Sequence, residues 1–219
     1  MNLAQIETDL QSSDLQVRLR AIVALKAFPA NSAVPILSRH IEDSDFLVRS
    51  FVARELGRHR ASEAFAAILQ MMCSDKDPNV RAEAANSLSL LGKDSIPHLV
   101  QRFVNDDHWL VRHSILAALV EMNCPEEVFQ VCCLGLEGRD ATVQEAAVVS
   151  LGSLARSQLS EAALSHLLAL KDSDADRIRI QVAYALKQFE DPAAKVALAQ
   201  LRQDRNHKVV GAAMEDLIS

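Results

Sequence analysis

Hydrophobic and polar positions recur in the same order seven times along the chain. Each copy starts with an acidic or polar residue, has Val or Ile three positions later, usually followed by Arg, and ends with small apolar residues and a leucine. The spacings between successive copies are 31, 32, 31, 32, 35 and 31 residues, measured between the anchor residues Val17, Val48, Val80, Val111, Val143, Ile178 and Val209. Periods of this length are typical of solenoids, in which neighbouring repeats complete one another's core.

The periodicity inside each copy is helical. The positions four, five and eight residues after the anchor are apolar, as in Ala84, Ala85 and Leu88, so they share one helix face with the anchor. The Asp three residues before the anchor suits an N-cap, and Pro78 suits the first turn. A second amphipathic segment lies between copies. We expect seven helix pairs, an A helix followed by the anchor-bearing B helix, in an all-α solenoid forming a right-handed superhelical arc, with one domain over residues 1–219.

Amino-acid composition limits the partners and the cellular location that we expect for this solenoid. A hydrophobic content of 49% excludes disorder, and no apolar run approaches the ~18 residues of a membrane span. The net charge of −6 argues against a nucleic-acid partner, which requires a basic surplus or stripe. The four cysteines form no CxxC motif and the N-terminus shows no secretory signal. We therefore expect free thiols and a cytoplasmic location.

An arginine follows the anchor in five copies: Arg18, Arg49, Arg81, Arg112 and Arg179. One interpretation is a cationic track for acids or phosphates. We favour a structural ladder, in which each arginine pairs with an aspartate four residues earlier or in the next repeat. The available partners are Asp14, Asp45, Asp77 and the segment 174–176. Gln144 and Val210 replace the arginine in the fifth and seventh copies, so the ladder is incomplete.

The repeated phrase resembles the HEAT-like repeat of the phycobilin lyase family. The resemblance covers essentially the whole chain and is strongest from Asp77 to Leu88. The stretch from Asn105 to Leu119 is similar to the corresponding segment of NblB-type phycobilisome-degradation proteins, with Trp109 and Ser114 at matching places. This resemblance implies a cyanobacterial protein that binds phycobiliproteins or handles their thioether-linked bilin.

The deoxyhypusine hydroxylases resemble the same architecture but hold iron with His-Glu pairs. This sequence contains no His-Glu dipeptide, so we expect no metal site and no required cofactor. Cys132 and Cys133 are adjacent and would point about 100° apart on a helix. We interpret them as packing residues and not as a redox pair.

The B-helix face opposite the anchors is unusually apolar. From the first repeat to the fifth it carries mostly apolar or small residues, including the aromatics Phe46 and Trp109 at one repeat position. Arg54, Asn86 and His113 fall on the same stripe, where they suit a polar or anionic group beside an apolar body. We expect these five residues to line a concave groove for a partner or ligand. In the alternative, neighbouring helices crowd this face and its residues pack between repeats.

The repeat, the resemblance and the apolar face together indicate three possible functions. The leading one is a binding protein that docks phycobiliproteins or holds their bilin, such as phycocyanobilin, with a role in phycobilisome disassembly or chromophore detachment. The second is a lyase that attaches the chromophore, with His113 as the general acid or base and Trp109 as a stacking platform. The third is a protein–protein scaffold without a small-molecule ligand.

Overall fold

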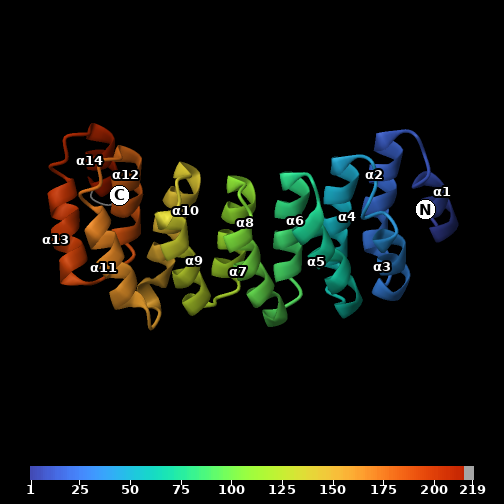
Figure 1. The fold of residues 1–219 in the computed structure, drawn as a ribbon, viewed down its shortest axis with the longest axis horizontal. Coiled ribbons are helices and arrows are strands. Elements are labelled where there is room, and N and C mark those ends of the chain that lie inside the picture. Colours follow the sequence, from blue (N-terminus) through green and yellow to red (C-terminus); the bar gives the residue numbers. More distant parts are fainter. Residues whose placement is uncertain (215–219) are drawn as a thin grey trace. The chain divides into compact units, whose positions relative to one another are not determined.

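The computed structural model describes residues 1–214, and all regular elements among them are helical (Figure 1). The predicted all-α solenoid of A and B helix pairs is confirmed. The A helices are α1 (Leu3–Asp9), α3 (Ala30–Ser38), α5 (Phe65–Ser74), α7 (Ile96–Asn105), α9 (Pro125–Glu137), α11 (Ser160–Leu170) and α13 (Pro192–Leu201). The B helices are α2 (Leu15–Ala24), α4 (Phe46–Arg58), α6 (Pro78–Ser89), α8 (Trp109–Glu121), α10 (Ala141–Ser153), α12 (Asp176–Leu186) and α14 (His207–Met214).

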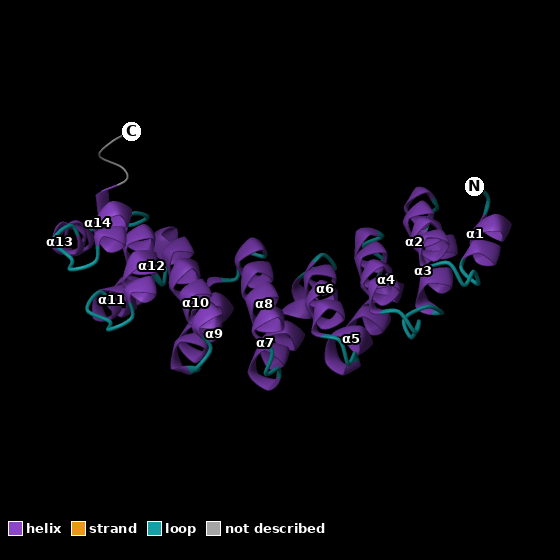
Figure 2. Cartoon of the chain, turned by 90° about the horizontal axis from the view of Figure 1, so that it is seen from above, coloured by secondary structure: helices purple, strands orange, loops and turns teal. Residues whose placement is uncertain are grey.

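Contacts divide the chain into two compact units, Met1–Ala118 (unit 1) and Leu119–Ser219 (unit 2). In unit 1, α4 packs against the B helices α2 and α6, and the A helix α5 packs against α6. Figure 2 shows the resulting layers in this unit, with α2, α4 and α6 on one side and α3 and α5 on the other. In unit 2, α10 packs on α9 and α12, and α12 packs on α14. The single domain expected over residues 1–219 stays a prediction.

Aspartates at the predicted positions cap the B helices. Each accepts a hydrogen bond from the backbone N–H two residues later, at 2.7 to 2.9 Å, which satisfies a donor that the helix itself leaves unpaired. The four caps are Asp14, Asp45, Asp77 and Asp140. Pro78 occupies the first position of α6, as predicted. The start of each of these helices is therefore encoded locally.

The core follows the predicted spacing. In α4 the anchor Val48 and the positions four, five and eight residues later are fully buried, and the same holds for Val80 and its partners in α6. The widest interval between copies contains a 3₁₀ turn, η4 (Leu154–Arg156), close to the predicted longer turn at 155–159. Three other 3₁₀ turns lie at η1 (Leu25–Ala27), η2 (Ser62–Ala64) and η3 (Lys93–Ser95). No helix among residues 1–214 is long and apolar enough to cross a membrane.

Candidate functional site

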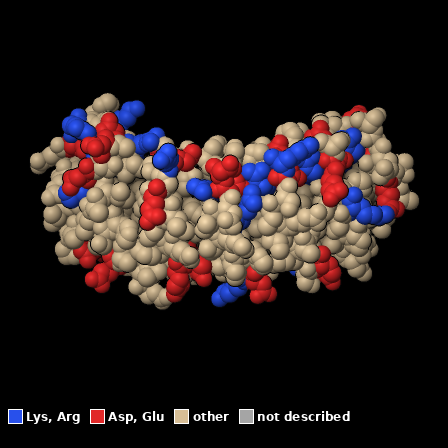
Figure 3. Space-filling model, viewed as in Figure 1, with Lys and Arg blue, Asp and Glu red and all other residues tan. Residues whose placement is uncertain are grey.

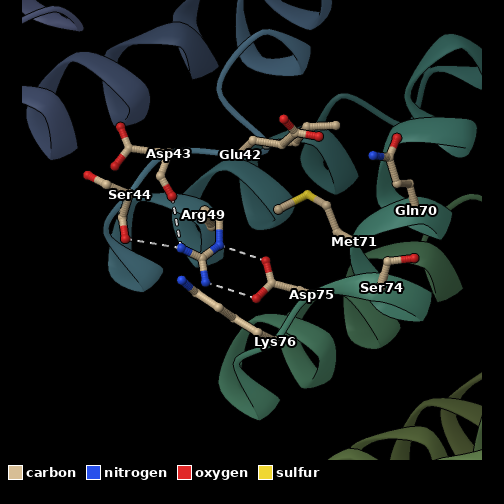
Figure 4. A pocket seen from close by; sticks show the side chains of 10 residues that line it. Glu42, Asp43, Ser44, Arg49, Gln70, Met71, Ser74, Asp75 and Lys76 are labelled. Carbon is tan, nitrogen blue, oxygen red and sulfur yellow. Dashed lines mark hydrogen bonds and ion pairs between the residues drawn. The ribbon is translucent and has the colours of Figure 1, made fainter.

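Arg49 and Arg179 of the ladder are buried, Arg18, Arg81 and Arg112 are half-buried, and their donors are used inside the fold. Arg49 donates from Nε and Nη2 to the two carboxylate oxygens of Asp75, at 2.6 and 2.9 Å, and from Nη1 to the carbonyl oxygen of Asp43 at 2.8 Å (Figure 4). The hydrogen bond from Arg49 to Asp75 raises the pKa of the guanidinium. A hollow of about 290 Å³ lies beside this pair, lined by Arg49 and Lys76 together with the acidic residues Glu42, Asp43 and Asp75. The Arg49 charge in its wall is already paired with Asp75.

The same rung recurs in both units. The pairs are Arg18 with Asp43, Arg49 with Asp75, Arg81 with Asp106, and Arg179 with Asp204. Each aspartate belongs to the following repeat and stands five residues before that repeat's anchor. The predicted pairing with an aspartate of the next repeat is confirmed, and Arg179 also pairs with Asp176 at 2.6 Å, inside the predicted segment 174–176. The expectation that Asp14, Asp45 and Asp77 pair with the arginines is wrong, because their carboxylates are occupied as N-caps.

Two further rungs differ from this pattern. Arg112 donates from Nε to the carbonyl oxygen of Asp106 at 2.6 Å and lies over the ring of Phe103. Gln144 donates to the carbonyl oxygen of Gly138, six residues earlier, at 2.8 Å. That bond matches the one from Arg49 Nη1 to the carbonyl oxygen of Asp43. Glutamine at this position therefore keeps the hydrogen bond to the backbone but cannot form the ion pair with an aspartate. The ladder residues stabilise the fold and do not form an open cationic track.

The five predicted binding residues all lie in unit 1, on its B helices. We call Phe46, Arg54, Asn86, Trp109 and His113 the unit 1 B face. Phe46 and Trp109 are 38% and 42% exposed, Asn86 and His113 are exposed, and Arg54 is half-buried. Phe46 and Trp109 begin α4 and α8, and α6 separates these helices in the chain and starts with Pro78 at the corresponding place. The two aromatics therefore stand at separate repeats.

Trp109 has a neighbour that the repeat pattern does not point to. The His108 ring stacks on it, with centroids 5.9 Å apart and an angle of 26° between the planes. His108 Nδ1 also accepts a 3.3 Å hydrogen bond from the N–H of Leu110. Two exposed or half-exposed rings therefore stand together at the start of α8, one turn before His113.

Part of the unit 1 B face is crowded, as the alternative interpretation proposed. Ala82 and Gly57 are buried where α4 meets α6. A Cβ atom added to Gly57 would lie 2.7 Å from Cβ of Ser87, closer than packed carbon atoms approach. The face is therefore closed at Gly57 and open at Phe46, Asn86, Trp109 and His113. None of the three hollows beside Arg49, Arg179 and His40 is lined by the five predicted residues.

A charged group beside Arg54 was not predicted. We call Arg54, Glu55, Arg58 and Glu83 the Glu55 cluster. Glu55 is fully buried, and its Oε1 lies 3.1 Å from Arg58 Nη1 and 3.5 Å from Arg54 Nε. The Arg54 guanidinium carbon lies 3.9 Å from the ring centroid of Phe51. Figure 3 shows acidic and basic side chains next to one another over the ends of α4 and α6.

Glu83 is the fourth member of the cluster, on α6. Burial raises its pKa; Arg54 and Arg58 oppose that shift, and the buried Glu55 adds to it. The signal for this cluster was present in the sequence. Glu55 stands seven residues after its anchor, where the seventh copy carries Asp216 and the other five carry Ala or Ser: Ala24, Ser87, Ala118, Ser150 and Ala185.

The cysteines of α9 lie in unit 2. Cys132 is buried, and burial raises its pKa, so it stays a protonated packing residue. Cys133 Sγ lies 3.7 Å from His166 Nε2, and His166 Nδ1 lies 3.0 Å from the carbonyl oxygen of Ala162. Burial raises the pKa of Cys133 as well, which disfavours a reactive thiolate. Residues 1–214 contain no group of three or more His, Cys, Asp or Glu side chains arranged to hold a metal ion.

Sequence comparison relates the chain to deoxyhypusine hydroxylases. It is 24% identical to the Drosophila melanogaster enzyme over 217 residues, which cover 87% of this chain and 70% of that protein. It is 32% identical to the Gibberella zeae enzyme over 117 residues, or 49% of this chain and 35% of that protein. The rat enzyme matches at 29% over 93 residues, or 42% of this chain and 31% of that protein. The chain thus spans about a third of the length of two of these relatives.

Structural comparison shows the fold. The complex of CpcE and CpcF of phycocyanin lyase from Nostoc sp. PCC7120 matches with a TM-score of 0.55 and 20% identity, over 99% of this chain and 95% of that one. A chain of the Kap95p–RanGDP complex matches with a TM-score of 0.70 and 18% identity, over 96% of this chain and 34% of that one. Residues 6–72, 41–120 and 131–218 match the family described as HEAT repeats, so the chain belongs to the HEAT-repeat family.

Proposed function

We propose that this chain is a binding scaffold that docks phycobiliproteins through the unit 1 B face. The observation that carries the proposal is the exposed ring of Trp109, stacked on His108 and one turn from His113. Aromatic and arginine side chains contribute most of the binding energy at protein interfaces. The ladder arginines form ion pairs or hydrogen bonds inside the fold and are not free to bind a partner. The unit 1 B face, with its exposed aromatic side chains, is therefore the candidate binding surface of unit 1.

The choice of partner is supported by two likenesses. The segment Asn105–Leu119, which contains Trp109 and His113, is similar to NblB-type phycobilisome-degradation proteins. The fold is similar to that of the CpcE–CpcF complex of phycocyanin lyase. A bilin has apolar rings that suit stacking on Trp109 and propionates that suit Arg54 and Asn86. The proposed role is phycobilisome disassembly or chromophore detachment, with chromophore attachment as the alternative direction.

The sequence relatives favour a second candidate, an activity like that of deoxyhypusine hydroxylase. The residues present do not fit the iron site expected of that family. The sequence has no His-Glu dipeptide, and residues 1–214 hold no group of three or more side chains suited to a metal. This candidate therefore ranks below the binding scaffold.

The first experiment is a titration of phycocyanin, and then of free phycocyanobilin, followed by visible absorption. We expect a shift or loss of the bilin band that is weakened in Trp109→Ala. The matched control is Tyr184→Ala, which removes an exposed aromatic side chain from a B helix of unit 2. No spectral change with either bilin source, together with no co-elution with phycocyanin, would contradict the proposal. Co-elution without a spectral change would leave a scaffold that does not contact the chromophore.

The enzymatic versions are separated by stoichiometry. A lyase alters the bilin spectrum at substoichiometric amounts, whereas a carrier saturates at about one ligand per chain. If His113 is the general acid or base, His113→Ala slows turnover without abolishing binding. Unchanged bilin release or transfer in His113→Ala would remove His113 from the mechanism.

A further inference from the structure

Glu55 departs from the residue type that most other copies carry at its repeat position. Seven residues after the anchor, the third and sixth B helices meet the preceding B helix, with Ser87 against Gly57 and Ala185 against Gly152. The residue at this position is Ala or Ser in five of the other six copies and Asp216 in the seventh. The contact of Gly57 with Ser87 shows why, because these backbones approach too closely for a further Cβ atom. Glu55 places a fully buried carboxylate at this position in the second copy.

Stability does not account for this carboxylate. A buried ion pair seldom stabilises a fold more than a well-packed apolar replacement does, because both charges lose their hydration. The neighbouring repeats achieve the same helix contact with Ala or Ser. Residues that break a local structural rule without a structural gain are concentrated at functional sites.

The effect of Glu55 is to hold two arginines on one helix face. Arg58 donates from Nη1 to Glu55, and Arg54 is placed between Glu55 and the Phe51 ring. The two guanidinium groups lie one turn apart, and the side chains of Arg58 and Arg54 are 49% and 36% exposed. Among the described residues, neither Nη atom of Arg54 nor Nη2 of Arg58 forms a hydrogen bond. These three nitrogen atoms of Arg54 and Arg58 are therefore available to donate hydrogen bonds to a partner.

We propose that Arg54 and Arg58 bind a carboxylate of an acidic segment on the partner protein. This inference rests on the proposed docking function and assigns the partner's chemistry at the unit 1 B face. The planar fork of arginine matches a carboxylate with two parallel hydrogen bonds. Arg54, Arg58 and Glu55 sum to one positive charge, and an ionised Glu83 on α6 brings the four-residue cluster to zero. This low net charge suits a single carboxylate better than a doubly charged phosphate. Asn86, exposed on α6, adds an amide one turn beyond Glu83.

The test uses the full chain and two labelled peptides, one rich in glutamate and one with glutamine at the same positions. Fluorescence anisotropy should show binding of the glutamate peptide and weak or no binding of the glutamine peptide. Arg54→Gln and Arg58→Gln should each weaken the glutamate peptide about tenfold, as expected for loss of a charge-assisted hydrogen bond. The control is Arg39→Gln, which removes an exposed arginine paired with Glu7 on the A-helix side.

Equal binding of both peptides, or equal weakening by Arg39→Gln, would overturn the inference. A second variant guards against a folding defect. Glu55→Ser introduces the residue that the third and fifth copies carry, and it should lower affinity several-fold while leaving the melting temperature unchanged. A fall in melting temperature with unchanged affinity would assign Glu55 a structural role and overturn the inference.

Phycocyanin separates this inference from the proposed function. Docking that is weakened by Trp109→Ala, Arg54→Gln and Arg58→Gln supports both, because Arg58 is assigned only to the carboxylate of the partner protein and not to a bilin propionate. Docking that depends on Trp109 but not on Arg54 keeps the proposed function and overturns the carboxylate site. Binding of the glutamate peptide that depends on Arg54, without any phycocyanin binding, keeps the carboxylate site and overturns the choice of phycobiliproteins.

Discussion

The contact between α4 and α6 in unit 1 and the contact between α10 and α12 in unit 2 use the same repeat positions for different surfaces. In both, a glycine nine residues after the anchor meets a small residue of the next B helix, Gly57 against Ser87 and Gly152 against Ala185. Beside this contact, unit 1 carries Arg54 and unit 2 carries the exposed Val149.

The comparison shows which repeat positions must carry particular residue types for the solenoid to pack. Close approach of B helices requires small residues, so that requirement recurs in both units. The position six residues after the anchor points away from the core and is free to vary. It carries Val23, Arg54, Asn86 and Ala117 in unit 1 and Val149 and Tyr184 in the described part of unit 2, so the two polar residues stand in the second and third copies. Lys187 Nζ covers the Tyr184 ring at 5.4 Å, so the two B faces differ in chemistry on one backbone plan.

The ladder varies from rung to rung, and each unit holds an ionic rung, such as Arg49 with Asp75 or Arg179 with Asp204, and a rung bonded to backbone carbonyls, Arg112 or Gln144. Unit 1 has three rungs in which an arginine meets an aspartate of the next repeat, and Asp106 is the most heavily bonded member. Asp106 accepts from Arg81, from Arg102 and from the N–H of His108. In unit 2 the Gln144 rung consists of hydrogen bonds to backbone carbonyls.

The largest effect is expected at Asp106. Asp106→Asn leaves buried guanidinium groups without their carboxylate and should lower the free energy of unfolding by about 3–5 kcal/mol. The counterpart in unit 2, Gln144→Ala, removes neutral hydrogen bonds and should cost about 1 kcal/mol. Urea unfolding of the full chain measures both. Equal losses would show that the ion pair between arginine and aspartate adds no stability beyond that of neutral hydrogen bonds.

At acid pH, the stability difference between the wild type and Asp106→Asn should disappear. Burial alone would raise the pKa of Asp106, but hydrogen bonds from Arg81, the His108 N–H and Arg102 lower it to about 2. The folded state therefore holds the proton less readily than the unfolded chain, whose pKa is near 3.8. The stabilisation is present above pH 3.8 and is lost as the pH falls toward 2. The difference between the wild type and Asp106→Asn should shrink over that window.

Alanine substitutions at the two glycine contacts should lower stability by an intermediate amount, and the loss should differ between unit 1 and unit 2. Gly57→Ala would bring Cβ to 2.7 Å from Ser87 Cβ and 2.9 Å from its Cα, and overpacking of this kind costs about 1–3 kcal/mol. Gly152→Ala reaches only 3.1 Å from Ala185 Cα, so its loss should be smaller. Thermal melts of the two variants compare them directly. A larger loss at Gly152 would contradict the tighter packing of α4 on α6.

Gly211→Ala is the internal control for this series. A Cβ atom there meets nothing within 4 Å among the described atoms. Alanine is favoured over glycine inside a helix by about 1 kcal/mol, so this variant should melt at or above the wild-type temperature.

The smallest effect is expected at Glu83, and it depends on pH. Burial raises the pKa of Glu83, so the folded state favours its protonated form. The stability that this form contributes is present at acid pH and is lost as the pH rises through the raised pKa. Glu83→Gln should therefore raise the melting temperature slightly at pH 7 and have no effect at pH 4. A variant that melts lower at pH 7 would show that attraction to Arg54 and Arg58 outweighs burial.

Local signals along the chain were sufficient for the helices and their order. Hydrophobic period, N-cap aspartates and a first-turn proline act within one helix, so the anchors, the caps and the alternation of A and B helices were predictable. The exposure of Phe46, Asn86, Trp109 and His113 follows from the same helical periodicity. Whether these residues form a groove for a bilin stays a prediction.

The contacts between repeats could not be predicted from the sequence pattern and were found only in the tertiary structure. The ladder arginines pair with Asp43, Asp75, Asp106 and Asp204 and not with the nearer N-cap aspartates, because the register between repeats sets which carboxylate is within reach. Gly57 and Ala82 lie on the same B-helix face as the five predicted residues but are buried, because neighbouring B helices approach there. The burial of Glu55 has the same origin. Periodicity describes one helix at a time, whereas burial and ion pairing depend on the neighbour that packs against it.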